Sequence, residues 1–143
     1  MSDTLEDVIS TTADLVGLGT AACGGVVSLH KLIQSYRHHP KHVRDLMQGL
    51  EELKGVLQSL TKTVQSDIGI DLSALQLPLQ RCIDACQEFE KEILKCSSQP
   101  GGDRTSFRDW AKLSYMGGDI DDFRRQLSGY QLTIGVALAD ANL

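Results

Sequence analysis

The chain has 143 residues, 41% hydrophobic and 23% charged, which fits a single soluble domain with its own core. The formal net charge of −5 disfavours general nucleic-acid binding. The first Lys or Arg is Lys31, after several acidic residues, so no secretory signal peptide is predicted, and four unevenly spaced cysteines indicate reduced thiols in a cytoplasmic protein.

The first predicted helix runs from about Thr4 to Tyr36 and contains an unusual number of glycines. The stretch 15–29 carries no charged residue and includes Gly17, Gly19, Gly24 and Gly25. Small residues recur every four positions and form what we call the small-residue stripe: Ala13, Gly17, Ala21 and Gly25. On a helix, such a stripe lets another backbone approach closely, as small-xxx-small patterns do in membranes.

Length and context limit what this stretch can be. As a helix, 15–29 spans about 22 Å, which is short of the roughly 30 Å hydrocarbon core of a bilayer. We therefore expect no ordinary single-pass anchor. Residues 17–22, GLGTAA, match a dinucleotide-binding fingerprint in form, but no strand precedes them, so no nucleotide site and no cofactor are predicted.

Two long helices with heptad spacing are predicted next. The second begins at about Pro40 and ends before a turn over 66–71, and its seam is Val43, Leu46 or Met47, Leu50, Leu53, Leu57, Leu60 and Val64. The third begins near Leu72, with a seam of Leu75, Leu79, Cys82, Cys86, Phe89, Ile93 and Cys96. Pro78 leaves two alternatives open: a separate short helix first, or a start close to Leu77.

The last part of the chain is predicted as a loop and two more helices. The loop covers 97–106, and a short helix over 107–116 carries Trp110, which either packs on the bundle or marks a membrane interface. Asp119 is expected to cap the final helix, whose seam is Ile120, Phe123, Leu127, Tyr130, Ile134, Ala137 and Ala141. No strand pattern is convincing, so the predicted fold class is all-α: a bundle of about four long helices plus one short helix.

Candidate sites are few. Cys82 and Cys86 are one helical turn apart, and their place in a seam favours packing over a redox or metal role. Four positively charged residues lie in the same part of the chain as all four histidines. We call the charged residues, Lys31, Arg37, Lys41 and Arg44, the basic stretch. It is a solvated corner between helices, a patch for anionic headgroups or an acidic partner, or a metal or pH-sensing site. No catalytic set is found, so an enzyme is not expected.

The order of these segments resembles a known family. The segments are LEDVISTTADLVGLGTAACGGVVSLHKLIQSY, then VRDLMQGLEELKGVLQSL, LQRCIDACQEFEKEI, WAKLSYMGGDIDDFRRQL and LTIGVALADANL. Together, over essentially the whole chain, they resemble the HeLo-like N-terminal domains of fungal STAND (NOD-like receptor) proteins. The sequence departs from that pattern at 116–118, MGG, where relatives often have an aromatic residue and a proline.

The resemblance implies an N-terminal effector domain of a larger receptor, followed by nucleotide-binding and repeat domains. It implies a role in heterokaryon-incompatibility-type programmed cell death and fungal innate immunity, through oligomerisation and insertion of the first helix into the plasma membrane. The expected partners are copies of itself, downstream receptor domains and anionic lipids.

A compatible mechanism follows as a hypothesis. At rest, the small-residue stripe packs against the seams of the second, third and fifth helices. On clustering, the stripes of neighbouring chains pack together in lipid, and the basic stretch stays at the headgroups. The alternative is a soluble homotypic interaction scaffold with no membrane activity.

Overall fold

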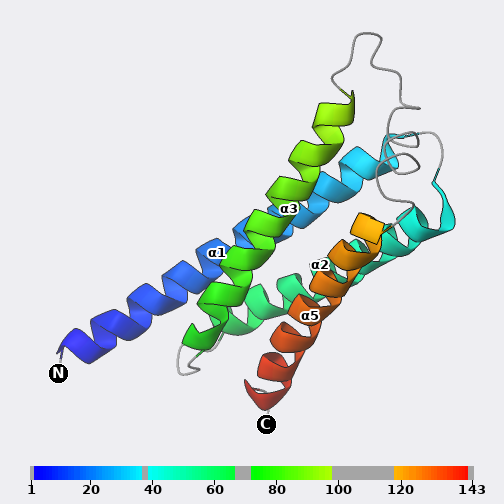
Figure 1. Cartoon of the computed structure of the whole chain (residues 1–143). Helices are drawn as coiled ribbons and strands as arrows, with labels where there is room; N and C mark the ends of the chain where they lie inside the picture. The colour runs from blue at the N-terminus through cyan, green and yellow to red at the C-terminus, as the bar shows by residue number, and fades with distance from the viewer. Residues whose placement is uncertain (1, 37–38, 67–71, 98–117, 142–143) are drawn as a thin grey trace.

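The structure, a computed structural model, describes residues 2–36, 39–66, 72–97 and 118–141, and it is all-helical in these ranges. The helices pack as a bundle and alternate in direction along the chain (Figure 1). They are α1 (Ser2–Gln34), α2 (Lys41–Ser66), α3 (Gln76–Ser97) and α5 (Gly118–Ala141), with one 3-10 turn, η1 (Ser73–Leu75). This confirms the all-α bundle. The short helix predicted over 107–116, with Trp110, lies outside the described residues, as does nearly all of the loop predicted over 97–106.

The central element is α2, which packs against both α1 and α5. Its predicted seam is confirmed, and Leu46 rather than Met47 occupies the second seam position. The fully or almost fully buried residues are Val43, Leu46, Leu50, Leu53, Leu57, Leu60 and Val64. Alternate steps of three and four keep these side chains on one face, so α2 supplies the apolar centre against which its neighbours pack.

The start of α3 resolves the alternatives that Pro78 left open. A separate 3-10 turn, η1, comes first, and α3 itself begins at Gln76. Pro78 then stands in the first turn of α3, where a missing backbone N–H removes no intrahelical hydrogen bond. The predicted seam is buried at every described position: Leu75, Leu79, Cys82, Cys86, Phe89 and Ile93. The side chain of Cys96 is not described.

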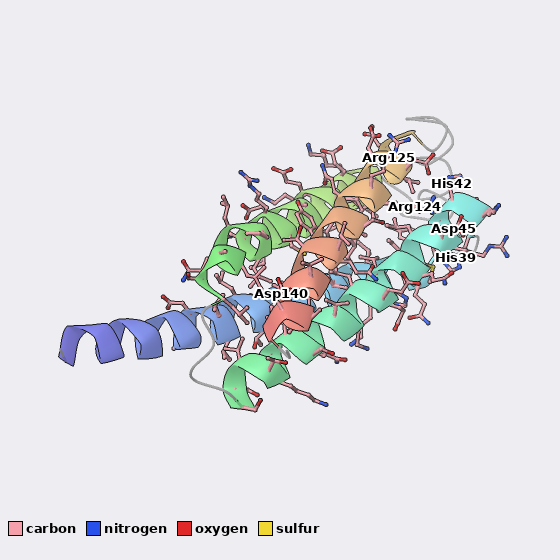
Figure 2. The ribbon with its side chains drawn as sticks, turned by 90° about the horizontal axis from the view of Figure 1, so that it is seen from below. His39, His42, Asp45, Arg124, Arg125 and Asp140 are labelled. Atoms are coloured by element: carbon pink, nitrogen blue, oxygen red, sulfur yellow. The ribbon has the colours of Figure 1, made fainter. Side chains whose placement is uncertain are left out.

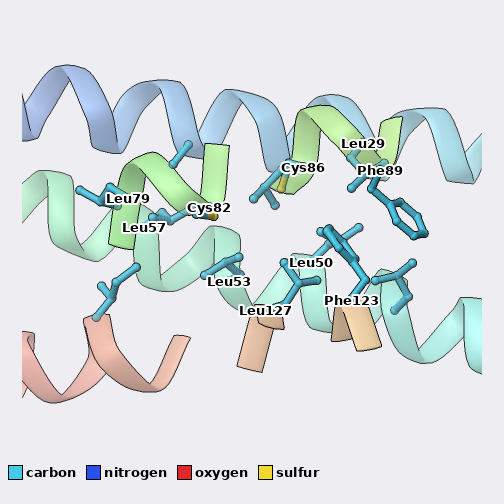
Figure 3. Close-up of a cluster of buried hydrophobic side chains, with 14 of the residues drawn as sticks. Leu29, Leu50, Leu53, Leu57, Leu79, Cys82, Cys86, Phe89, Phe123 and Leu127 are labelled. Atoms are coloured by element: carbon cyan, nitrogen blue, oxygen red, sulfur yellow. The ribbon is translucent and has the colours of Figure 1, made fainter. Parts of the chain in front are cut away.

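The last helix differs from its prediction at both ends. It begins at Gly118, so Asp119 lies in the first turn instead of capping the helix. Near the other end Leu138 is buried while Ala137 is only half-buried, because the larger side chain gains more from burial. Ile120, Phe123, Leu127 and Ile134 are buried as predicted, whereas Tyr130 is half-buried and packs at the edge of the core. Phe123 stacks on Phe89 of α3 with ring centroids 4.3 Å apart (Figure 3).

The position of α1 corrects one expectation. It packs on α2 and α3, whereas α5 packs on α2 and, less extensively, on α3. Within the described residues α1 and α5 share no substantial interface, so α1 packs on two of the three helices predicted, and on the short turn η1 beside them. The N-terminal end of α1 projects beyond the other helices, as Figures 1 and 2 both show. One side of α1 is therefore left uncovered.

Candidate functional site on the first helix

The face by which α1 joins the bundle has heptad spacing. Its buried residues are Leu15, Gly19, Ala22, Val26, Leu29, Ile33 and, just after the helix, Tyr36. Steps of four and three keep them in line along the helix. Burying each large side chain contributes about 1.5–3 kcal/mol. This row, and not the small-residue stripe, holds α1 in place.

The prediction that the small-residue stripe packs against the bundle is wrong for most of its length. Ala13, Gly17 and Ala21 are exposed, and only Gly25 is half-buried. A step of four residues advances about 40° around a helix, so the stripe winds away from any straight contact line. The row of larger side chains, with its shorter repeat, wins the interface because it removes more apolar surface from water.

The exposed side of α1 is nevertheless built from small residues. Opposite the buried row lie Ala13, Gly17, Thr20, Gly24 and Ser28, all exposed; we call them the smooth face. A Cβ added at Gly17 or Gly24 would meet nothing within 4 Å. The smooth face therefore leaves room along α1 for the backbone of another helix.

One glycine of α1 serves a close internal contact. A Cβ at Gly19 would lie 3.0 Å from the side-chain oxygen of Thr61 on α2, whose hydroxyl donates a hydrogen bond to the carbonyl of Leu57 at 3.0 Å. Gly19 thus lets α1 and α2 approach each other. Sequence reasoning counted it as one more glycine of the apolar stretch, although its spacing from Leu15 and Ala22 marks it as part of the buried row.

A groove opens beside the smooth face. It has a volume of about 690 Å³ and lies between α1 and the first turns of α3. Ala13, Gly17 and Leu18 line one wall, and the exposed Leu77 stands in the other. This part of α1 can take an apolar side chain from outside the bundle without any change of fold.

The apolar part of α1 is longer than its uncharged run. The segment Ala13–Gln34 has 22 residues and a mean hydropathy of 1.4, so by length and composition it can cross a membrane. At 1.5 Å per residue it spans about 33 Å, more than the uncharged run 15–29 suggested. The core helix of a soluble protein and a signal sequence near the N-terminus meet the same criterion.

Polar contacts at the surface tie α1 to its neighbours. The Ser28 hydroxyl donates to Glu90 of α3 at 3.2 Å, and His30 lies 3.5 Å from Glu51 of α2. These groups are wholly or partly exposed, and such pairs contribute about 0–1 kcal/mol each. The apolar row, not these contacts, sets the cost of removing α1 from the bundle.

The basic stretch lies where α1 ends and α2 begins, far from the N-terminal end of α1 (Figure 1). Lys31, Lys41 and Arg44 are exposed, and Arg37 lies outside the described residues. The ring atom Nε2 of His42 is buried without a hydrogen-bond partner in the described part of the chain. No group of three metal-ligating side chains occurs among the described residues. The structure thus presents exposed positive charge at one end of the bundle.

The two cysteines of α3 belong to the core. Cys82 and Cys86 are buried between α3 and its neighbours (Figure 3), which confirms their predicted packing role. A hydrogen bond with Cys82, together with burial, raises the pKa of the Cys86 thiol. A raised pKa keeps a thiol protonated and unreactive at neutral pH. Cys23 on α1 is half-buried.

The sequence matches one known protein family over almost its whole length. Residues 6–143 match the family model described as "Pigment biosynthesis cluster protein PigL N-terminal". No curated protein and no solved structure matches the chain.

Proposed function

The chain belongs to the PigL N-terminal family, whose members are HeLo-like helical domains, and on this premise we propose that it is a membrane-acting effector domain. In this proposal, α1 leaves the bundle, associates with α1 of other copies and enters a bilayer, which leads to cell death. The domain acts in the cytoplasm and at the plasma membrane, without catalysis or a cofactor, as the N-terminal part of a receptor-type protein.

One observation carries the proposal: from 15 to 29, α1 carries no charged residue, even on the side that the bundle leaves exposed. This stretch lies within the segment Ala13–Gln34, which is long and apolar enough to cross a membrane by length and composition. A helix that serves only a soluble core gains nothing from an apolar or glycine-rich outer side, and each glycine costs about 0.5–1 kcal/mol relative to alanine. A close contact with another helix in lipid would offset that cost.

Release of α1 would break the contacts that hold it in the bundle. The bundle holds α1 through the row from Leu15 to Ile33 and through weak surface contacts such as that of His30 with Glu51. Transfer into lipid would keep the apolar side chains of α1 away from water, so the cost of release falls mainly on the α2 and α3 side chains that α1 had covered. Clustering by downstream domains would raise the local concentration of α1 and favour its association.

The smooth face is the contact that we assign to neighbouring first helices. It is accessible before any release, because Gly17 and Gly24 have no neighbour within 4 Å of a built Cβ. Close backbone approach at such positions is the main source of helix association in lipid, where no hydrophobic effect acts between helices. Gly25 faces Cys86 across the α1–α3 interface at rest, so it becomes available for such a contact only after α1 is released.

The test replaces Gly17 and Gly24 together by leucine and measures dye release from anionic vesicles. Both sites are open, so we expect a folded, helical protein. If loss of close packing costs about 1.4 kcal/mol or more, leakage should fall at least about tenfold. The matched control is Gly55→Leu on α2, an exposed and equally open glycine, which should leak like the wild type. Wild-type leakage by the double variant would overturn the proposal.

A further inference from the structure

The outward side of α5 carries a second heptad row. It consists of Arg125, Gly129, Leu132, Val136 and Ala139, all exposed, with steps of four and three; we call it the α5 outer face. The buried seam through Phe123, Leu127 and Ile134 lies on the opposite side of the helix. An α-helix with two such rows presents one to its own bundle and leaves the other without a partner.

The exposure of this row is unusual within the described residues. Leu132 is 69% exposed and Val136 53%, and the two lie one turn apart. They also line a groove of about 560 Å³ between α5 and α2, with Val56 and Gly135 among its other lining residues. A Cβ at Gly129 or Gly135 would meet nothing within 4 Å. The α5 outer face therefore joins projecting apolar side chains to open small positions, as a helix-helix contact requires.

We propose that a second copy of this chain binds here, with the two α5 helices antiparallel across a two-fold axis near Leu132. In this register, Val136 of one copy lies over Gly129 of the other, where the absent side chain leaves room for it. Arg125 lies opposite Asp140 of the other copy at both ends of the contact. A two-fold contact is self-complementary, so one fit is used twice.

The charges select the antiparallel arrangement. Figure 2 shows Arg125 near the start of α5 and Asp140 near its end. The Arg125 side chain is 81% exposed and pairs only with the neighbouring Asp122, at 3.4 Å, in the described part of the chain. Asp140 is exposed and has no ion pair among the described residues. A parallel pair would set Arg125 against Arg125 and Asp140 against Asp140, which is repulsive.

The size of the contact sets its expected strength. The helix between Arg125 and Asp140 is about 22 Å long. One helix pair of this length buries less surface than the roughly 1,200 Å² typical of stable interfaces, so the dimer should be weak and dependent on concentration. The inference does not rest on the membrane role of α1, because the α5 outer face lies on another helix.

The first test measures molar mass by light scattering over a concentration series for the whole 143-residue chain. The wild type should pass from monomer to dimer, and Leu132→Asp should weaken dimerisation at least about tenfold, because a charge would be buried at the centre. Leu94→Asp is the matched control: Leu94 is another exposed leucine, on α3, and its substitution should leave dimerisation unchanged. A wild type that stays monomeric to about 1 mM would overturn the proposal.

The second test fixes the register by exchange of charge. Arg125→Asp and Asp140→Arg should each weaken the dimer, and the double variant should recover most of the loss, because the pair is restored with its signs reversed. Additive weakening in the double variant would overturn the antiparallel register. Vesicle binding that Leu132→Asp abolishes in a monomeric wild type would assign the face to lipid and likewise overturn the proposal.

Discussion

The four glycines in the uncharged stretch 15–29 of α1 have different roles. Gly19 lies in the buried row and allows the close approach of Thr61, whereas Gly17 and Gly24 face outward with nothing near them. Gly25 faces Cys86, 3.8 Å from a built Cβ, which is ordinary contact. Composition alone cannot separate these roles, because each depends on which neighbour lies over the glycine.

The difference predicts opposite effects of one substitution. Gly19→Leu should lower the free energy of unfolding by about 1–3 kcal/mol, because the side chain would enter the contact with Thr61. Gly24→Leu should raise it by up to about 1 kcal/mol, since leucine is a better helix former and the site is open. Urea denaturation followed by circular dichroism measures both. Equal stabilities for the two variants would contradict the assigned contact.

The buried face of a helix can be predicted from the sequence when large apolar side chains mark it. The seam of α2 could be predicted almost completely because leucines stand at heptad spacing between polar residues, and the described part of the α3 seam follows the same logic. The face of α1 could not, because its small residues drew attention to a four-residue repeat that buries little surface. The sequence of α5 contains two regular heptad rows, the core seam and the outer row with Leu132 and Val136. Only the burial of their side chains shows which row faces outward.

The candidate site was predictable in part for the same reason. The exposed charges of the basic stretch follow from their type, because Lys and Arg are rarely buried. The smooth face shares Ala13 and Gly17 with the predicted stripe but continues through Thr20 and Gly24. The heptad row of α1 is present in the sequence, but Gly19 and Ala22 weaken it as a signal, so the smooth face opposite it is hard to recognise before burial is known.

Release of α1 as a unit predicts a contrast between two core truncations. Leu29→Ala on α1 and Ile134→Ala on α5 should each cost about 2–5 kcal/mol of stability, because both side chains are fully buried. Only Leu29→Ala weakens the attachment of α1, so it alone should increase leakage of anionic vesicles. Thermal unfolding and dye release on the same samples compare the two. Equal leakage from both variants would mean that general destabilisation, not release of α1, limits the activity.

At the scale of the whole molecule, charge is distributed unevenly. The net charge is −5, yet exposed Lys31, Lys41 and Arg44 gather where α1 meets α2. An acidic protein is repelled by an anionic surface on average, so attachment would need to occur at this end of the bundle. Such attachment is electrostatic and is screened within about 8 Å at physiological salt.

Charge reversal tests this arrangement. Lys31, Lys41 and Arg44 changed to Glu should greatly reduce sedimentation with anionic vesicles, since each positive charge near such a surface contributes about 1 kcal/mol. Lys62, Arg81 and Lys91 changed to Glu alter the net charge equally but lie elsewhere, so binding should fall much less. Raising the salt concentration should weaken wild-type binding. Salt-independent binding, or equal losses in both triple variants, would show that the basic stretch does not direct attachment.

The opposite directions of α1 and α5 have a consequence for symmetry. In the single chain, α1 and α5 run in roughly opposite directions (Figure 1). A two-fold axis that pairs the α5 helices antiparallel also reverses α1, so the projecting ends of the two first helices would point away from each other. While both first helices stay in their bundles, such a dimer cannot present them to the same bilayer, whereas a cyclic assembly around an axis normal to the membrane points every copy the same way. The α5-paired dimer would then be a storage form, and its dissociation a step that precedes assembly at the membrane.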